Sequence, residues 1–215
     1  MRNTVFALLL AMALAAPSAL AVDGAVLINQ STVTAAGGFP YIISQPGSYK
    51  LSGNLTMNTT SNGNHNGVDI AIGISSSRVT LDLNGFTITV NNVAPVSGCC
   101  TTINHDFYAI AELGTFTQVA IRNGNITLAS AAPGSIHPPN GYGIFLPTST
   151  NNSIEDLSIY LDFSVGLAAE LGPGTLLRHT RMAGYAVAFA VCPSLFVENV
   201  SIPPNGGVGP GGGLG

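Results

Sequence analysis

The chain has 215 residues, of which 7% are charged and 26 are glycine, and its formal net charge is -4 at pH 7. Ordinary globular domains contain about 25% charged residues, so the surface of this protein has to be made mainly of asparagine, serine and threonine. Its six lysine and arginine residues cannot form a large basic patch, which argues against nucleic acid as a partner.

Residues 1–21 have the pattern of a secretory signal. Arg2 precedes an apolar stretch at 5–16, and the segment ends in Ala19-Leu20-Ala21. This pattern predicts cleavage after Ala21 and export to the periplasm, the cell surface or the medium. This apolar stretch is short for a spanning helix, and outside the N-terminus no apolar run approaches the roughly 20 residues that such a helix needs, so we expect no transmembrane segment after signal cleavage.

Residues 22–57 are expected to form an N-terminal cap. The segments 40–43 and 48–51 are strand-like and flank the turn Gln45-Pro46-Gly47. A protein built from stacked repeats needs an atypical first unit that covers the end of its core, and this segment is the candidate.

Residues 78–88, RVTLDLNGFTI, indicate a strand, an Asn-Gly corner and a second strand, and weaker copies follow at 119–128, 153–161, 176–182 and 195–202. The copies align in three apolar columns. They are Leu81, Ile121, Ile154, Leu177 and Val197; Ile70, Ile110, Ile144, Leu167 and Val187; and Ile126, Ile159, Met182 and Ile202. The first column steps by 40, 33, 23 and 20 residues, and the others shorten with it. This indicates a constant repeat core with extra length in the loops 90–106 and 130–140.

A repeat of about 20 residues is too short for a strand and a full helix, but it fits one turn of a parallel β-helix. We therefore predict an all-β fold, a single-stranded right-handed parallel β-helix of about five to six turns over residues 58–205. Residues 206–215 would be a glycine-rich open or truncated end. An antiparallel β-sandwich is the alternative, but it does not require the same residue types to return in register.

The segments RVTLDLNGFTI, VAIRNGNITL and SIEDLSI resemble the turns of bacterial secreted right-handed parallel β-helix proteins with the pectin-lyase-like architecture. The resemblance covers residues 47–202 and implies that fold. Such proteins include pectate lyases, polygalacturonases, other polysaccharide lyases, phage tail spikes and non-catalytic surface proteins. The polygalacturonase-like motifs Asn-Thr-Asp, Asp-Asp, His-Gly and Arg-Ile-Lys do not occur in this sequence.

Charged residues follow each anchor of the first column, with alternating sign: Asp82, Arg122, Glu155, Arg178 and Glu198. Opposite charges on adjacent strands stabilise each other by roughly 0.2–1 kcal/mol, which is sufficient reason for this pattern. The alternative is a cleft for a sugar acid or a metal ion.

The next column contains Asn123, Asp156, His179 and Asn199. Asparagine suits a corner, whereas Asp156 and His179 on adjacent turns could act as an acid-base pair beside Arg178. The candidate ligand face is therefore Arg122, Glu155, Asp156, Arg178 and His179.

Aromatic residues occupy two kinds of position. Tyr108, Tyr142 and Tyr185 each precede the second column by two residues, so we expect an inward tyrosine stack. Tyr160 and Phe163 are expected to be more exposed and could stack on a sugar ring.

Cys99, Cys100, His105 and Asp106 lie in the first long loop. Adjacent cysteines cannot easily serve one tetrahedral ion, so we predict neither a metal site nor any other cofactor. The pairing of Cys99, Cys100 and Cys192 is left open by their odd number.

The sequence favours an exported, non-catalytic β-helix scaffold that contacts polysaccharide along one outward face. The alternative is a polysaccharide lyase or glycoside hydrolase that acts on an acidic polysaccharide at the candidate ligand face. Ice binding would need regular outward threonine columns, which the sequence pattern does not indicate. The oligomeric state is left open.

Overall fold

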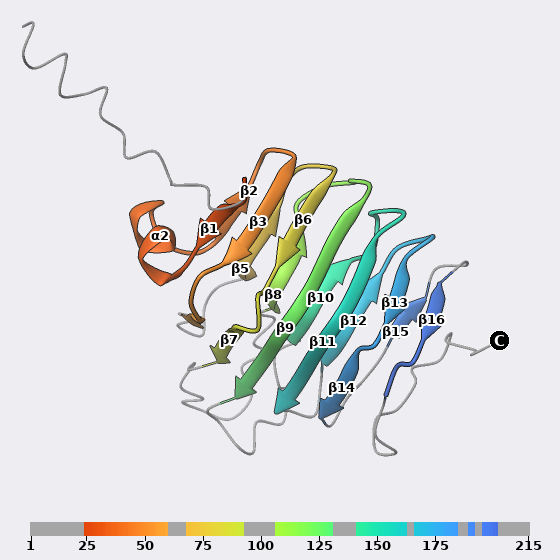
Figure 1. The fold of residues 1–215 in the computed structure, drawn as a ribbon. Coiled ribbons are helices and arrows are strands. Elements are labelled where there is room, and N and C mark those ends of the chain that lie inside the picture. The colour runs from red at the N-terminus through yellow and green to blue at the C-terminus, as the bar shows by residue number, and fades with distance from the viewer. Residues whose placement is uncertain are drawn as a thin grey trace, which may run out of the picture.

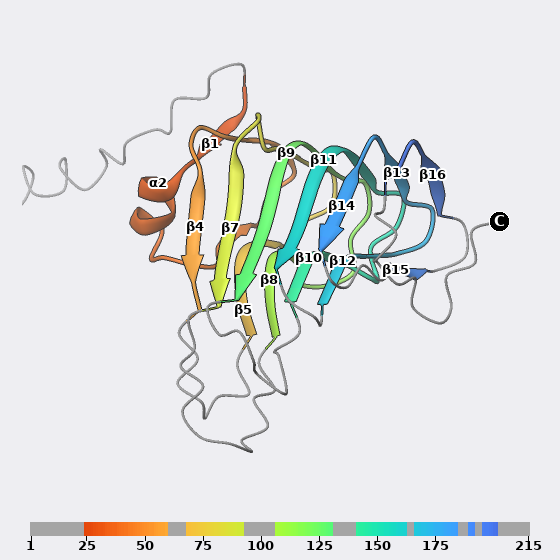
Figure 2. The ribbon, with the colours of Figure 1, turned by 90° about the horizontal axis from the view of Figure 1, so that it is seen from below.

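The computed structural model describes residues 24–59, 68–92, 106–130, 141–162, 166–184, 189–191 and 195–201. These residues form mostly β-strands, arranged in two parallel sheets, with one short helix (Figures 1 and 2). The prediction of an all-β fold with parallel strands is confirmed. In the described segments no helix has the length and apolar character needed to cross a membrane.

The larger sheet has ten strands. Its main path is β1 (Val26–Ile28), β3 (Gly47–Leu51), β6 (Val79–Asp82), β9 (Val119–Ser130), β11 (Ser153–Asp162), β13 (Leu176–Arg178) and β16 (Phe196–Glu198). Three further strands extend this sheet: β4 (Leu55–Asn58), β7 (Thr87–Asn92) and β14 (Arg181–Gly184). Strand β7 pairs with the second half of β9 and with β4, and β14 pairs with the second half of β11. The two long strands therefore join both parts of the sheet.

The smaller sheet has six strands in the order β15 (Phe189–Val191), β12 (Gly166–Leu171), β10 (Gly141–Leu146), β8 (Asp106–Glu112), β5 (Val68–Ile74) and β2 (Tyr41–Ile43). From β8 to β12 the chain visits the two sheets in turn, and each return places a new strand beside the previous one in parallel. Figure 2 shows the smaller sheet behind the larger one.

The register confirms the first apolar column. Its five members are direct partners on neighbouring strands, and the first four, Leu81 to Leu177, have no exposed surface. In the third column Ile126, Ile159 and Met182 are also partners, while Ile202 lies outside the described residues.

The second column is only partly correct. Ile110 and Ile144 are partners, but Ile110 pairs on its other side with Ile72 instead of Ile70. In the same way Ile144 pairs with Ala169 and not with Leu167. Apolar residues two positions apart fit the alternation of a strand equally well, so spacing alone could not choose between them.

The core lies between the two sheets. Ile88, Ile126 and Ile159 of the larger sheet are fully buried, as are their counterparts Ile110 and Ile144 in the smaller sheet. At Gly143 the backbone comes so close that an added Cβ would lie 2.5 Å from the Ala168 carbonyl oxygen and 2.8 Å from Ile159 Cγ2. Glycine is required here because the neighbouring backbone cannot move aside without disturbing the core.

Helix α2 (Gln30–Ala35) lies at the β1 end of the sheets and buries Val33 (Figure 1). Its start is fixed by a reciprocal pair of hydrogen bonds. Thr32 N–H donates to Asn29 Oδ1 at 3.0 Å, and Asn29 N–H donates to Thr32 Oγ1 at 2.6 Å. The expected cap at 22–57 therefore contains a helix that the sequence analysis did not predict, and its strands β3 and β4 already pair with β6 and β7.

Candidate functional site

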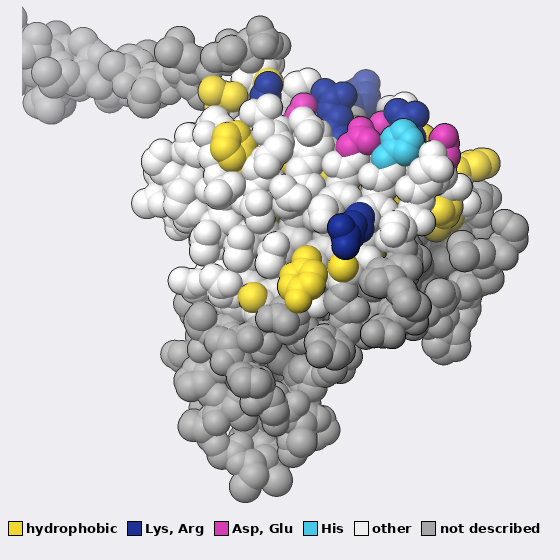
Figure 3. All heavy atoms as spheres, turned by 60° about the horizontal axis from the view of Figure 1, so that its bottom comes forward, with side chains coloured by type: hydrophobic (Ala, Val, Ile, Leu, Met, Phe, Trp, Pro, Cys, Tyr) yellow, Lys and Arg dark blue, Asp and Glu magenta, His cyan; other side chains and the backbone are white. Residues whose placement is uncertain are grey.

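The alternating charges form one outward column with six members. The register places Lys50 opposite Asp82, and then Arg122, Glu155, Arg178 and Glu198 follow strand by strand. We call these six residues the charge ladder. Figure 3 shows acidic and basic side chains gathered along one border of this face.

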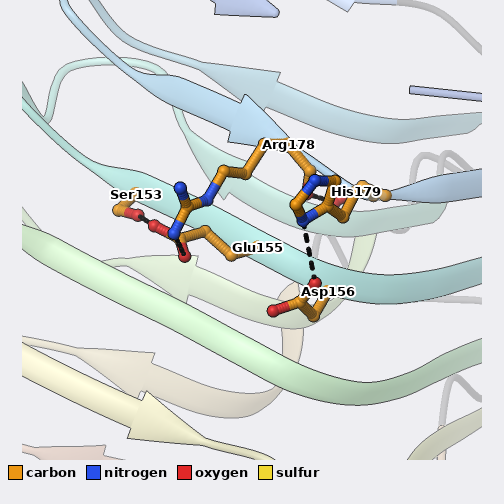
Figure 4. A network of polar contacts seen from close by, with 6 residues as sticks. Ser153, Glu155, Asp156, Arg178 and His179 are labelled. Atoms are coloured by element: carbon orange, nitrogen blue, oxygen red, sulfur yellow. Dashed lines mark hydrogen bonds and ion pairs between the residues drawn. The ribbon is translucent and has the colours of Figure 1, made fainter. Parts of the chain in front are cut away.

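Most ladder charges are engaged with each other. Arg122 Nε lies 3.4 Å from Asp82 Oδ2, and Arg178 Nη2 donates to Glu155 Oε2 at 2.6 Å. The other oxygen of Glu155 accepts a short hydrogen bond from the Ser153 hydroxyl (Figure 4). Both oxygens of Glu155 are therefore occupied by groups of the protein itself.

These contacts alter the acidity of two ladder residues. The Ser153 hydroxyl, together with Arg178, lowers the pKa of Glu155 below its ordinary value, against a smaller opposing effect of burial. The hydrogen bond to Glu155 raises the pKa of Arg178. Glu155 and Arg178 thus stabilise each other as ions, the state in which each is least able to exchange a proton with a substrate.

Asp156 and His179 lie beside the ladder and contact each other. His179 Nδ1 is 3.2 Å from Asp156 Oδ1, and both side chains are well exposed (Figure 4). Four of the five predicted face residues therefore lie close together, as Figure 4 shows. The fifth, Arg122, is the partner of Glu155 on the neighbouring strand β9.

The backbone explains the residue types next to the ladder. We call Asn123, Asp156, His179 and Asn199 the corner column; their φ angles are 60°, 52°, 47° and 52°, all left-handed. Among non-glycine residues, Asn, Asp and His are the types most enriched in this conformation. The corner thus accounts for an aspartate and a histidine at these positions without any catalytic requirement.

The chain matches no known protein-family model, no curated protein and no solved structure.

A second outward column lies on the other half of the same sheet, where β4 and β7 pair with the second half of β9. Thr56, Thr89 and Thr127 are direct partners on β4, β7 and β9, and the next residue in the column is Tyr160. We call the three threonines the threonine column. The sequence pattern does not indicate this column, because residues 22–57 are expected there to form a cap and the pairing of β4 with β7 does not follow from the spacing of the apolar columns.

Tyr160 ends this column with 46% of its surface exposed, as expected from the sequence. Its partner on β14 is Ala183, a small residue that leaves space beside the tyrosine ring. Side chains that are neither hydrophobic nor charged, together with the backbone, cover most of the described part of this face in Figure 3. The surface can therefore offer hydroxyl and amide groups together with one aromatic ring.

The predicted tyrosine stack forms, but apart from the core. The Tyr108 and Tyr142 rings are 4.7 Å apart and nearly parallel, and Phe145 lies 5.0 and 5.1 Å from them. None of the three belongs to the contiguous core cluster. Tyr142 precedes Gly143, whose Cβ position points into the core, so Tyr142 points the other way. The expected inward direction therefore does not hold for Tyr142, whereas Tyr108 is buried with 7% of its surface exposed, and Tyr185 lies outside the described residues.

The loop residues considered for metal binding, Cys99, Cys100 and His105, lie outside the described residues, as does Cys192. Among the residues that the structure describes, no group of three or more His, Cys, Asp or Glu side chains is placed to hold a metal ion.

Proposed function

We propose that the protein is an exported right-handed parallel β-helix that binds polysaccharide on the outward face of its ten-stranded sheet and catalyses no reaction there. The alternation of the chain between two parallel sheets supports the β-helix, and parallel crossovers are right-handed in about 98% of cases. The signal-like pattern of residues 1–21 supports export to the periplasm, the cell surface or the medium.

The observation that carries this proposal is the continuous outward face shared by the threonine column, Tyr160 and the charge ladder. Its groups recur from strand to strand, at the spacing of about 4.8 Å that parallel strands impose. A polysaccharide is also a repeating ligand with hydroxyl groups and apolar sugar faces. Threonine hydroxyls can bond the former, and an exposed tyrosine ring can pack on the latter.

The ladder favours binding over catalysis. Its acids are opposed by arginines on adjacent strands, and both oxygens of Glu155 are already hydrogen-bonded. A general acid or base has to be free to reach the proton that it transfers.

One observation supports the second candidate, a lyase or hydrolase of acidic polysaccharide. The exposed Asp156 and His179 lie within 3.2 Å of each other, and Arg178 is adjacent. A pair of this kind could exchange a proton with a bound sugar. In that case Arg178 would have to exchange its bond with Glu155 for one with the substrate.

A single experiment separates the two candidates. The chain from Val22 onward is incubated with neutral and uronic-acid polysaccharides, and retention, new reducing ends and ultraviolet absorbance of unsaturated products are followed. Retention without turnover, weakened in Tyr160→Ala but unchanged in Leu113→Ala, is the expected result. Leu113 is a suitable control because it is similarly exposed, at 44% against 46%, and follows β8 of the other sheet.

Turnover that disappears in Asp156→Ala or His179→Ala would refute the non-catalytic proposal and support the second candidate. If no polysaccharide is retained or cleaved, both candidates are refuted.

A further inference from the structure

The outward face of the smaller sheet carries a column that is apolar except for one carboxylate. Its members, each a direct partner of the next, are Ile42, Gly73, Ala111, Phe145 and Glu170. Both chain neighbours of Phe145 are core residues, as are both chain neighbours of Glu170. Since side chains alternate along a strand, Phe145 and Glu170 therefore point away from the core.

Apolar side chains are exposed along this column. Ile42 and Leu113 are 41% and 44% exposed, and both reach over Gly73, where an added Cβ would lie 2.8 Å from the Cδ1 atom of each. Phe145 follows on the other side of the small Ala111. We call Ile42, Leu113 and Phe145 the apolar patch. The turns that border it at the C-terminal ends of β5, β8 and β10 all belong to the described residues.

Phe145 is held in place by the two stacked tyrosines. Its ring centroid lies 5.0 Å from that of Tyr108 and 5.1 Å from that of Tyr142, and its plane is tilted by 59° and 68° to theirs. The tyrosine centroids are themselves 4.7 Å apart. Rings at these distances are in contact with one another, so a ligand would lie on the outer side of Phe145 and not between the rings.

Glu170 lies next to Phe145 with a charge that the protein does not balance. The two residues are partners on adjacent parallel strands, which are spaced by about 4.8 Å. Glu170 is half-buried, and among the described residues no hydrogen bond or ion pair engages its carboxylate. Burial, together with nearby Glu112, raises its pKa, as expected for a carboxylate without a cationic neighbour.

The smaller sheet has no basic side chain that could supply the missing charge. Its six strands contain Asp69, Asp106, Glu112 and Glu170 but no lysine, arginine or histidine. Every described lysine, arginine and histidine lies in the larger sheet or directly beside one of its strands. A second copy of this chain on the same face would bring further acids against these four, so charge complementarity favours a cation as the occupant.

We infer that the outward face of the smaller sheet binds an organic cation, an amine or quaternary ammonium group carried on an apolar body. The apolar body lies on the apolar patch. The cationic group rests against the Phe145 ring, whose face attracts positive charge, and Glu170 balances that charge. This site lies on the other sheet from the proposed polysaccharide face, and the inference is independent of polysaccharide binding.

The test titrates the chain from Val22 onward with benzyltrimethylammonium, which joins a quaternary ammonium group to an apolar ring. Benzyl alcohol is the uncharged control probe. Affinity is measured by calorimetry, and the amide resonances of Phe145 and Glu170 are followed by NMR. Glu198→Gln is the matched control for Glu170→Gln, because it removes one carboxylate from β16 of the other sheet.

The wild type should bind the cation with a dissociation constant of about 1 mM and should bind benzyl alcohol at least about threefold more weakly. Glu170→Gln and Phe145→Leu should each weaken cation binding about threefold to fivefold, the loss expected for a partly exposed ion pair or cation–π contact. Glu198→Gln should leave it unchanged. Circular dichroism of each variant checks that the sheet content is retained.

Equal affinity for the two probes would overturn the inference, as would cation binding that Glu170→Gln leaves unchanged. It would also be overturned if neither amide resonance shifts at about 10 mM cation, tenfold above the expected dissociation constant. A doubled molecular mass in light scattering that Leu113→Ser abolishes would show that a second copy covers the apolar patch, and this result would equally refute a cation site there.

Discussion

Lys50 on β3 lies directly opposite Asp82 on β6, although Lys50 belongs to the segment that was expected to be a cap. This pair adds a sixth member to the charge ladder, which then contains three basic and three acidic residues in strict alternation. The ladder is therefore electrically balanced, so we expect its main effect to be on stability.

Reversal of one ladder charge tests this role. Arg178→Glu would place three acids in succession, from Glu155 to Glu198, so the urea midpoint should fall, and it should fall further at low salt than at high salt. Arg181→Glu is the matched control because its register partners are Ser158 and Ser201, which carry no charge. Equal shifts in the two variants would show that ladder register contributes nothing.

The corner column makes a prediction about backbone conformation. His179 has a φ of 47°, which costs an ordinary L-residue about 1–2 kcal/mol but is tolerated by asparagine. His179→Asn should therefore retain the stability of the wild type, whereas His179→Val should lose about 1–2 kcal/mol in urea unfolding. A large loss in His179→Asn would mean that the imidazole itself is needed at this corner.

Two glutamates should affect the pH dependence of stability in opposite directions. Hydrogen bonding lowers the pKa of Glu155 below 4.5, so its stabilising contribution is present above pH 4.5 and is lost as the pH falls further, through the lowered pKa. Burial, together with nearby Glu112, raises the pKa of Glu170 above 4.5, so stability is lost as the pH rises from 4.5 through the raised pKa.

Urea titrations of Glu155→Gln and Glu170→Gln at a series of pH values would measure both effects. At pH 7 the first variant should be less stable than the wild type and the second more stable. Well below pH 4.5 both differences should become small. Differences of the same sign at pH 7 would contradict the opposite environments of these two carboxyl groups.

Gly172 should be intolerant of any side chain. An added Cβ would clash with the carbonyl oxygen of Ser149 and lie 3.0 and 3.1 Å from those of Pro147 and Leu146. We expect Gly172→Ala to lose about 3 kcal/mol, because backbone atoms cannot rotate away as a side chain could. Gly53→Ala, where the nearest atom is Asn29 Cβ at 3.6 Å, should be close to neutral in the same thermal or urea measurement.

The sequence predicted the structure best in segments where successive residues alternate between the buried and the exposed face of a strand. The column from Leu81 to Val197 followed from that alternation, and the charge ladder followed from the column. The sequence could not show that Ile110 pairs with Ile72, because Ile70 has the same parity. It also could not show that Tyr142 faces away from the core, since this follows from the close approach of Gly143 to Ala168 and Ile159.

The residues of the candidate site could be predicted from the sequence, but the hydrogen bonds that they make could not. The charge pattern indicated Glu155 and Arg178 as neighbours, but the bond from Ser153 that occupies the second carboxylate oxygen needed side-chain positions. The threonine column needed the pairing of β4 with β7, which joins residues 33 apart in the chain. The capping box of Asn29 and Thr32 was visible in the sequence and could have indicated helix α2.

The parallel register has a consequence for the way this chain reaches its native state. Even the most local strand pairing among the described residues, such as Leu177 with Val197, joins positions 20 apart, and many pairings span 33 or 40. No tight hairpin is present among these strands to start the sheet quickly, so each step of assembly closes a long loop before it gains a contact. Refolding should therefore be slow for a chain of this size, in the range of milliseconds to seconds or longer that is typical of folds dominated by non-local contacts.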